Sequence, residues 1–209
     1  MSDSTRQTVD RYDRRASRYE RRWAAYLRHT HGRFMKKLDF GKNDRLLDLS
    51  AGTGLLASDL LSSGRSFGSL TLNEPSRGML DRARSRLSGR DDLTFTSYAA
   101  ENFPWEEYRF DAIFILNALH FYPRQREILR GAYEALAGGG RLYLLDWDRS
   151  GWFRPINAFI QVTMAEYINT RSLEEIRGML QETGFAVRGM RSWRFRWWKL
   201  CYAEGFREG

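Results

Sequence analysis

The stretch RLLDLSAGTGLLA, residues 45–57, decides the fold of this chain. Its first half is a short apolar run, typical of a strand buried on both faces, and its end returns to an apolar helical pattern. Between them, Gly52 and Gly54 can adopt positive φ angles and leave no side chain between the backbone and a ligand. Glu74 follows twenty residues after Gly54, where a second strand would end with a carboxylate placed for ribose hydroxyls. The stretch therefore predicts a pocket for a nucleoside cofactor and indicates an enzyme.

The composition is that of a globular protein. The 209 residues are 42% hydrophobic and 29% charged, which predicts one domain with a full core. Residues 1–30 are rich in charge and lack the apolar segment of a signal peptide. The longest uncharged apolar run, residues 112–123, is too short to cross a bilayer. We therefore expect a cytoplasmic protein that is not integral to a membrane, and a peripheral position at the inner face of a membrane stays open. The single cysteine, Cys201, is expected to be buried, free and inert.

Basic residues concentrate at both ends of the chain. Residues 1–40 carry a net charge of +6 and residues 188–209 one of +4, whereas the segment between them carries −2. At both ends the arginines are interleaved with Trp and Tyr or Phe, as in WRFRWWK at residues 193–199. Such basic aromatic faces suit an anionic membrane surface or an amphiphilic partner. RNA is the less favoured partner, and an ordinary packed helix with a sheet-covering hairpin is the alternative without any partner.

The hydrophobic periodicity predicts strands and helices in turn. An amphipathic helix, or two in succession, is expected over residues 5–38. Strands and helices then alternate, and two strands end the chain without a helix between them. This order predicts an α/β, Rossmann-like fold: a seven-stranded sheet, mostly parallel, with an antiparallel C-terminal hairpin and helices on both faces. The expected strands are 45–50, 67–72, 93–97, 110–116, 141–146, 185–190 and 195–203; the later helices are 53–61, 76–87, 124–137 and 173–182, and residues 152–169 are expected to be apolar and partly helical.

Two cofactors fit the glycine loop. The segment GTGLLA satisfies G-x-G-x-x-A, so an NAD-dependent oxidoreductase is one reading. Three features favour S-adenosylmethionine. Asp48 ends the apolar strand, where its carboxylate can meet the methionine ammonium, and dinucleotide folds usually lack the antiparallel final strand. The chain also has no Tyr-x-x-x-Lys pair of the kind that short-chain dehydrogenases use.

Six segments, in order and spacing, resemble the class I S-adenosylmethionine-dependent methyltransferases, in particular the group typified by the ubiquinone/menaquinone methyltransferases. They are YDRRASRYE (12–20), LDLSAGTG (47–54), NEPSRGMLDRAR (73–84), AAENFPW (99–105), FDAIFILNALHFYP (110–123) and YEALAGGGRLYLLD (133–146). The resemblance implies a methyltransferase with residues 1–40 as an N-terminal amphipathic helical lid over the cofactor and residues 41–209 as one compact domain.

The resemblance also implies which residues hold S-adenosylmethionine. Those of the glycine loop would surround the methionine end, the acidic residue after the second strand would accept both ribose hydroxyls, and later residues would pack on adenine or border it. The cofactor-binding residues are expected to be Asp48, Ser50, Gly52, Gly54, Glu74, Pro75, Met79, Ala100, Glu101 and Asn117. Two positions depart from the family pattern: Ser50 replaces the usual first glycine, and Ala99 replaces an aspartate that often binds the adenine amino group. Backbone groups or Glu101 are the expected substitutes there. No metal site is predicted.

The sequence says less about the residues that bind the methyl acceptor. Alignment of the nucleophile, the methyl group and the sulfur supplies much of the rate, so a general base is optional. His120 lies just past the fourth strand, where the sites of open α/β sheets form, so it is the candidate base or orienting group; a structural role is the alternative. Tyr12 and Tyr19 share one helical face of the expected lid, Tyr19 as a catalytic candidate and Tyr12 as an acceptor contact. The residues after the fifth strand that are expected near the acceptor are Trp147, Asp148 and Trp152.

The sequence thus favours a methyltransferase for a small or amphiphilic acceptor, such as a lipid or quinone-like molecule at a membrane surface. An RNA methyltransferase, an NAD-dependent oxidoreductase and a non-catalytic cofactor-binding module remain the alternatives.

Overall fold

A computed structural model describes residues 1–151 and 168–209 of the chain. Trp152 and nearly all of the segment 152–169, for which partly helical structure is expected, lie outside these residues. Each of the seven expected strands has a counterpart in the structure. The elements are α1 (Asp3–Met35), β1 (Arg45–Asp48), α2 (Leu55–Ser62), β2 (Ser69–Asn73), α3 (Arg77–Arg86), β3 (Leu93–Thr96), η1 (Ala100–Asn102), η2 (Trp105–Glu107), β4 (Phe110–Leu116), η3 (Leu119–Phe121), α4 (Gln125–Ala135), β5 (Leu136–Trp147), α6 (Leu173–Glu182), β6 (Ala186–Phe195) and β7 (Trp198–Phe206).

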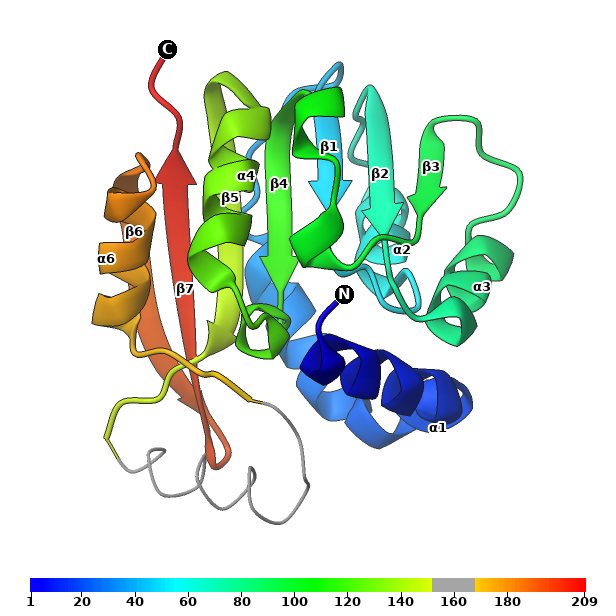
Figure 1. Ribbon diagram of the computed structural model, residues 1–209. Helices are drawn as coiled ribbons and strands as arrows, with labels where there is room; N and C mark the ends of the chain where they lie inside the picture. Colours follow the sequence, from blue (N-terminus) through cyan, green and yellow to red (C-terminus); the bar gives the residue numbers. More distant parts are fainter. Residues whose placement is uncertain (152–167) are drawn as a thin grey trace.

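The strands form one seven-stranded sheet in the order β3-β2-β1-β4-β5-β7-β6 (Figure 1). The first five are parallel to their neighbours, and β7 pairs antiparallel with both β5 and β6. The predicted mixed, Rossmann-like sheet is confirmed. The chain runs outward from β1 to β3 and then returns to place β4 beside β1, so the strand order reverses between β1 and β4. Ligands of open α/β sheets bind at such a switch point, beyond the carboxyl ends of the strands.

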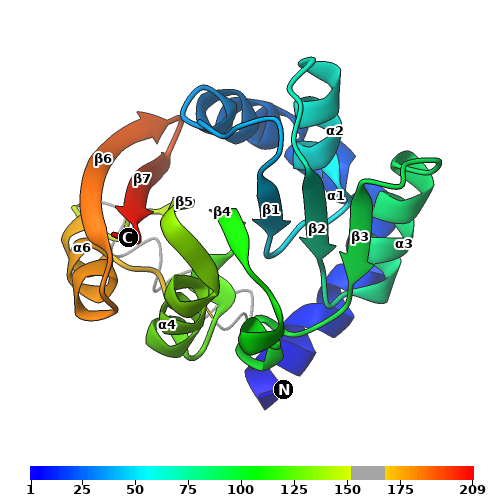
Figure 2. The ribbon, with the colours of Figure 1, turned by 90° about the horizontal axis from the view of Figure 1, so that it is seen from above.

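Helices cover both faces of the sheet, as predicted (Figure 2). Successive strand residues point to opposite faces, and both sets are buried. Leu47 and Ile113 pack with α4 and α6 on one face. Leu46 and Phe114 pack with α2 and the end of α1 on the other. The continuous apolar runs of the central strands follow from this double burial.

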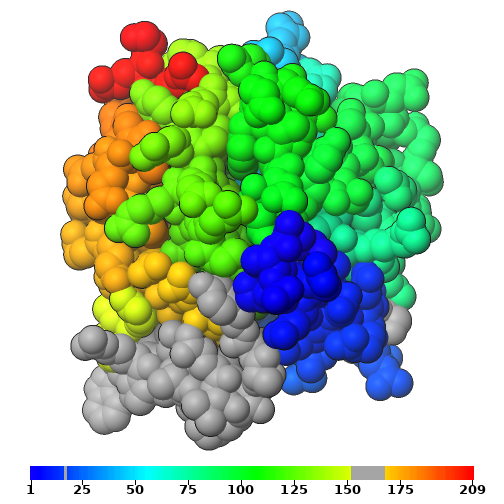
Figure 3. Space-filling model, in the orientation of Figure 1, coloured from blue at the N-terminus to red at the C-terminus, as the bar shows by residue number. Residues whose placement is uncertain are grey.

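The N-terminal segment forms one continuous helix, α1, rather than two. Its beginning crosses the carboxyl ends of the strands, and Figure 3 shows its first turns lying directly against the central part of the molecule. The Asp13 carboxylate accepts hydrogen bonds from Ser76 Oγ at 2.5 Å and from the backbone N–H of Gly78 at 2.8 Å, both at the start of α3. At its other end, Phe34 is fully buried in the core. The helix is therefore anchored at its C-terminal end and attached by polar contacts at its beginning.

The helix expected over residues 124–137 ends earlier than the three glycines predict. α4 ends at Ala135, and β5 starts at Leu136 and continues through residues 138–140. The pairing jumps from Phe110 with Leu136 to Ala112 with Arg141, so the glycines bulge out of the strand pair. A Cβ at Gly140 would lie 2.8 Å from a backbone oxygen, which shows that the glycines permit a close backbone approach rather than simply ending a helix.

The C-terminal hairpin is longer than predicted and turns at Arg196 and Trp197, inside the stretch WRFRWWK. Arg196 has a φ of 56°, a left-handed conformation that glycine or asparagine usually takes in such turns. The sequence offers no glycine or proline there, which is why periodicity alone started the last strand at residue 195. The turn exposes Trp197 at the tip of the hairpin, with 56% of its surface accessible.

Candidate active site

The loop after β1 has the backbone that its glycines predict. Gly52 and Gly54 have φ angles of 55° and 73°. A Cβ on Gly54 would come within 3.1 Å of Ala83 on α3, whereas one on Gly52 would meet nothing within 4 Å. Gly54 is therefore required for close packing of the loop on α3. Gly52 leaves open space at the carboxyl end of β1.

The Glu74 carboxylate joins this loop to the next one. Its two oxygens accept hydrogen bonds from the backbone N–H groups of Gly52, at 2.9 Å, and Ser76, at 2.8 Å. Burial raises the pKa of Glu74 to about 7, and burial together with the charge of Glu74 raises the pKa of Asp48 to about 7 as well. Among the described residues, no cationic side chain contributes to stabilising either carboxylate. Two buried acids without a cation form a site for a ligand that brings positive charge and hydroxyl groups.

Most of the expected cofactor-binding residues gather here. One cavity is lined by Ser50, Gly52, Glu74, Pro75, Met79, Ala100, Glu101 and Asn117, and an adjoining one by Asp48, Ser50, Gly52 and Asn117. Gly54 lines neither cavity, in keeping with its packing on α3. Ser50, which stands where the family has glycine, shares a hydrogen bond with the Tyr122 hydroxyl at 2.6 Å. The carboxylate of Glu101 is engaged by the chain's own N-terminus, through Ser2 N and Thr5 Oγ1, both at 2.8 Å.

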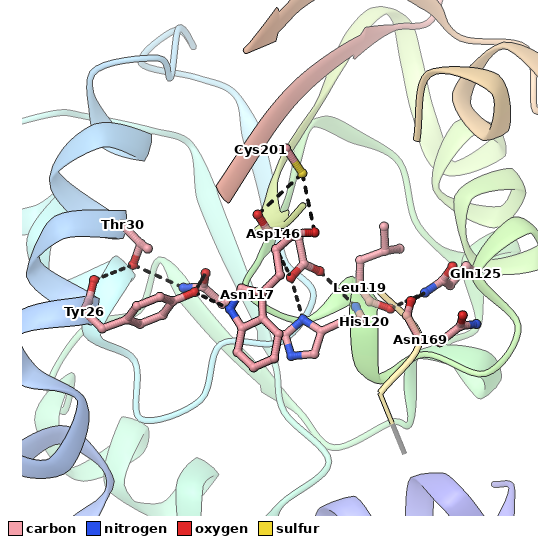
Figure 4. A network of polar contacts seen from close by, with 10 residues as sticks. Tyr26, Thr30, Asn117, Leu119, His120, Gln125, Asp146, Asn169 and Cys201 are labelled. Atoms are coloured by element: carbon pink, nitrogen blue, oxygen red, sulfur yellow. Dashed lines mark hydrogen bonds and ion pairs between the residues drawn. The ribbon is translucent and has the colours of Figure 1, made fainter. Parts of the chain in front are cut away.

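Asn117 connects the end of β4 to α1. Its φ is 55°, its Oδ1 accepts from the Tyr26 hydroxyl at 2.7 Å, and its Nδ2 donates to Thr30 Oγ1 at 3.2 Å. The same Tyr26 hydroxyl accepts from Trp147 Nε1 at 2.7 Å. Figure 4 shows these side chains converging. Tyr26 and Thr30 were not predicted, because nothing local in the sequence pairs a helix residue with a strand end some 90 residues away.

His120 forms a buried pair with Asp146 at the end of β5 (Figure 4). Its Nδ1 lies 2.5 Å from Asp146 Oδ1, and its backbone N–H donates to Asp146 Oδ2 at 2.9 Å. With the Nδ1 proton directed at the carboxylate, a neutral imidazole keeps its lone pair on Nε2. Nε2 has no hydrogen-bond partner among the described residues, and the ring stacks on Trp147 at 4.2 Å. Asp146 was not predicted from the sequence. Its signal was an acidic residue at the end of the apolar strand β5, which pairs with β4, the strand that precedes His120.

A larger cavity, of about 840 Å³, lies between α1, the ends of β4 and β5, and the hairpin tip. Its aromatic and polar lining comprises Tyr12, Tyr19, Trp23, Tyr26, Asn117, His120, Phe121, Trp147, Trp197 and Trp198, and six arginines of α1 complete it. Tyr12, Tyr19, Asn117 and Phe121 also line the cavity beside Glu74, so the two cavities adjoin. Burial raises the pKa of Tyr12 and of Tyr19, so both hydroxyls stay protonated at neutral pH.

Cys201 is buried and forms no disulfide, as predicted, and burial raises the pKa of its thiol. Among residues 1–151 and 168–209, no helix is both long and apolar enough to cross a membrane.

The sequence matches known proteins in the region of the site. A family model described as a methyltransferase domain matches residues 46–140. The ubiquinone/menaquinone biosynthesis C-methyltransferase UbiE of Xanthomonas oryzae pv. oryzae (strain MAFF 311018) is 29% identical over 167 residues, which cover 68% of this chain and 66% of that protein. UbiE of Stenotrophomonas maltophilia (strain K279a) is 33% identical over 121 residues, 56% of this chain and 48% of that protein. The matches thus span between about half and two thirds of these relatives.

Solved structures share the fold. The Haloferax volcanii protein solved in complex with the Trm112 methyltransferase activator superimposes with a TM-score of 0.81 at 16% identity, covering 95% of this chain and 98% of that one. An S-adenosylmethionine-dependent methyltransferase from Thermotoga maritima gives 0.74 at 20% identity, covering 94% and 98%.

The match of residues 46–140 to the methyltransferase-domain model and the shared fold indicate an S-adenosylmethionine-dependent methyltransferase, and S-adenosylmethionine is the cofactor that this similarity implies. Within that class the chain is similar to the UbiE group. The antiparallel β7 and these matches decide against the NAD-dependent reading of the glycine loop. The buried carboxylates of Asp48 and Glu74 fit a cationic ligand that carries ribose hydroxyls.

Proposed function

We propose that this chain transfers a methyl group from S-adenosylmethionine to a small aromatic or amphiphilic acceptor, such as a quinone-like molecule, bound in the 840 Å³ cavity. One observation carries the proposal: this aromatic cavity adjoins the acidic cavity at Tyr12, Tyr19 and Asn117. The UbiE relatives, named as C-methyltransferases of quinone biosynthesis, support a quinone-like acceptor and a carbon nucleophile.

The cavity beside Glu74 and the small adjoining cavity beside Asp48 would hold the cofactor, which supplies an electrophilic methyl group. The Asp48 carboxylate would bind the methionine ammonium, and Glu74 the ribose hydroxyls. Pro75, Met79 and Ala100 would border adenine. Holding donor and acceptor in adjoining cavities aligns the reacting atoms, which is the largest contribution such an enzyme can make.

His120 is the proposed general base. The acceptor's proton would pass to Nε2 of His120. The Nδ1 proton would stay on the ring, hydrogen-bonded to the Asp146 carboxylate, which would stabilise the resulting imidazolium. Because Nε2 is shielded from solvent, this transfer requires a neighbouring side chain to move when the acceptor binds. Tyr19 stays protonated, so it would donate a hydrogen bond rather than accept a proton.

The beginning of α1 is the proposed lid. It carries Tyr12 and Tyr19 over both cavities, and it is attached there by the Asp13 contacts with α3. The last turns of the predicted lid segment, with Phe34 and Leu38, belong to the core. Only the first part of the segment would therefore open to admit ligands.

An amphiphilic acceptor would be reached from an anionic membrane surface, with the hairpin tip as the contact. The exposed Trp197 lies between Arg196 and the buried Trp198, a combination of aromatic and basic side chains that suits the membrane interface. Co-sedimentation with phosphatidylglycerol vesicles should weaken in salt and in a Trp197→Gln variant. Undiminished binding by that variant would remove the hairpin tip from this role.

Calorimetry and mass spectrometry test the proposed function. The wild type should bind S-adenosylmethionine and, with a lipid and metabolite extract, yield products heavier by one CH₂ unit. Transfer to RNA instead of to an extract component would favour the RNA alternative. Cofactor binding with transfer to neither would leave a non-catalytic binding module.

A further inference from the structure

A row of arginines lies along one side of α1 and borders the acceptor cavity. Its members recur at spacings of three and four residues, which places them on one face of the helix. This arginine row comprises Arg11, Arg14, Arg15, Arg18, Arg21 and Arg22. All of them are exposed except Arg11, which is half-buried.

Two acidic side chains of α1, those of Asp13 and Glu20, point away from the row. Asp13 is bonded to Ser76 and Gly78, and Glu20 pairs with Arg86 at 2.7 Å, both toward α3. No acidic side chain is among the described residues that line the acceptor cavity. Across the described ranges 1–151 and 168–209, no ion pair involves Arg14 or Arg18. The residues of α1 that line the cavity thus include six arginines and no acidic side chain.

Like charges at this spacing repel and destabilise a helix. Burial lowers the pKa of the Arg11 guanidinium, and the neighbouring charges of Arg15 and Arg14 lower it further. A bound anion would relieve this repulsion, and guanidinium groups are well suited to carboxylate and phosphate.

The other walls of the cavity are aromatic. Trp147 stacks on His120, and its ring centroid lies 4.5 Å from that of Trp198. The ring centroids of Tyr12 and Phe121 lie 5.6 Å apart, in an edge-to-face arrangement. The cavity therefore combines an aromatic wall suited to a flat ring with a cationic border.

We propose that the methyl acceptor is a planar aromatic compound that carries a carboxylate or phosphate, and that the arginine row binds this anionic group. This inference rests on the proposed function, since it specifies the acceptor of the same site. It also gives the charged helix face a role that is separate from membrane contact at the hairpin tip.

Two probes with the same ring test it: naphthoate, which is anionic, and naphthalenemethanol, which is neutral. Binding is followed by quenching of tryptophan fluorescence, because four tryptophans line the cavity. Naphthoate should bind at least about tenfold more tightly, as charge-assisted hydrogen bonds require, and salt should reduce the difference. The double variant Arg14→Gln/Arg18→Gln should lose most of this preference without weakening naphthalenemethanol binding.

The matched control is Arg6→Gln/Arg28→Gln, which removes the same charge from exposed positions of α1 outside the cavity lining. It should keep the preference. Equal affinities for the two probes, or a preference that survives in the Arg14/Arg18 variant, would overturn the proposal.

Lipid headgroups also carry anionic groups. Binding to vesicles is therefore measured separately, to distinguish a lipid headgroup from the anionic group of a small acceptor. The Arg14/Arg18 variant should still bind vesicles of phosphatidylglycerol and phosphatidylcholine as the wild type does. Loss of vesicle binding together with an intact naphthoate preference would assign the row to the membrane and overturn the proposal. Cofactor calorimetry runs in parallel: a protein that binds S-adenosylmethionine without preferring naphthoate refutes this inference alone, whereas one that fails to bind the cofactor refutes the proposed function.

Discussion

The cavity beside Glu74 is formed mainly by short loops that follow neighbouring parallel strands, whereas the cavity beside His120 is formed by a helix, two strand ends and a hairpin tip from distant parts of the chain. Their charges differ as well. The first, together with the small cavity that adjoins it, holds the two buried carboxylates of Glu74 and Asp48, and the second is bordered by arginines. In the proposed function, the loops of the shared fold would therefore bind the cationic cofactor, and the helix and hairpin around the second cavity would bind the acceptor.

The largest effect should come from the acidic side. Asp48→Asn or Glu74→Gln should weaken S-adenosylmethionine binding about 100-fold, because losing one partner of a buried charged contact costs about 3 kcal/mol. Isothermal titration calorimetry measures this directly. Glu107→Gln, an exposed carboxylate outside both cavities, should bind as the wild type does. Equal affinity in all three variants would break the distinction between an acidic and a cationic cavity.

A change in the His120–Asp146 pair beside the larger cavity should affect chemistry rather than cofactor binding. His120→Gln and Asp146→Asn should each lower kcat about 100-fold, a usual contribution of general-base catalysis, with cofactor affinity preserved. The solvent deuterium isotope effect on kcat, which reports the proton transfer, should change in His120→Gln. If kcat falls but the isotope effect stays the same, the pair has only a structural role.

Cofactor affinity should rise with pH between about 6 and 8. In the cofactor-free protein, burial holds the pKa of Asp48 and of Glu74 at about 7. Asp48 must lose its proton to bind the methionine ammonium, and Glu74 must lose its proton to accept hydrogen bonds from both ribose hydroxyls. Affinity should therefore fall up to about tenfold per pH unit below 7 for each proton released. Calorimetry in buffers of different ionisation enthalpy counts the protons. An affinity that is constant over this range would show that the two carboxyls are already ionised.

The same carboxyls link pH to stability. Their folded-state pKa values lie above the unfolded ones, so their contribution to stability is present below about pH 4 and is lost as the pH rises toward 7. S-adenosylmethionine should accordingly raise the melting temperature more at pH 8 than at pH 6. Asp48→Asn should reduce this pH difference; a cofactor-induced shift of equal size at both pH values would contradict the assignment.

The smallest expected effect lies in the helix that spans both cavities. Asp13→Ala removes two hydrogen bonds between α1 and α3, which should speed cofactor release about fivefold, equivalent to about 1 kcal/mol. Stopped-flow displacement measures the rate. Asp10→Ala, an exposed position on the same helix, is the matched control, and equal rates in the two variants would mean that α1 does not act as a lid.

Local sequence was sufficient on the cofactor side. The apolar run before Gly52 and the spacing to Glu74 predict the switch-point loops, because each loop follows directly from its own strand. Tyr26 and Asp146 could not be predicted in this way, since their partners are brought together only by the folded sheet. The left-handed turn at Arg196 was missed for a related reason: tertiary packing of the neighbouring tryptophans, rather than a turn-forming residue, holds it.

Methyl transfer between the two cavities is tested most directly by following a deuterium-labelled methyl group of S-adenosylmethionine by mass spectrometry. The wild type, incubated with a lipid and metabolite extract, should place the label on a small aromatic compound. Asp48→Asn should abolish the labelled product through lost cofactor binding, and His120→Gln should reduce it at saturating cofactor. A protein that binds the cofactor but labels no small molecule would contradict the account.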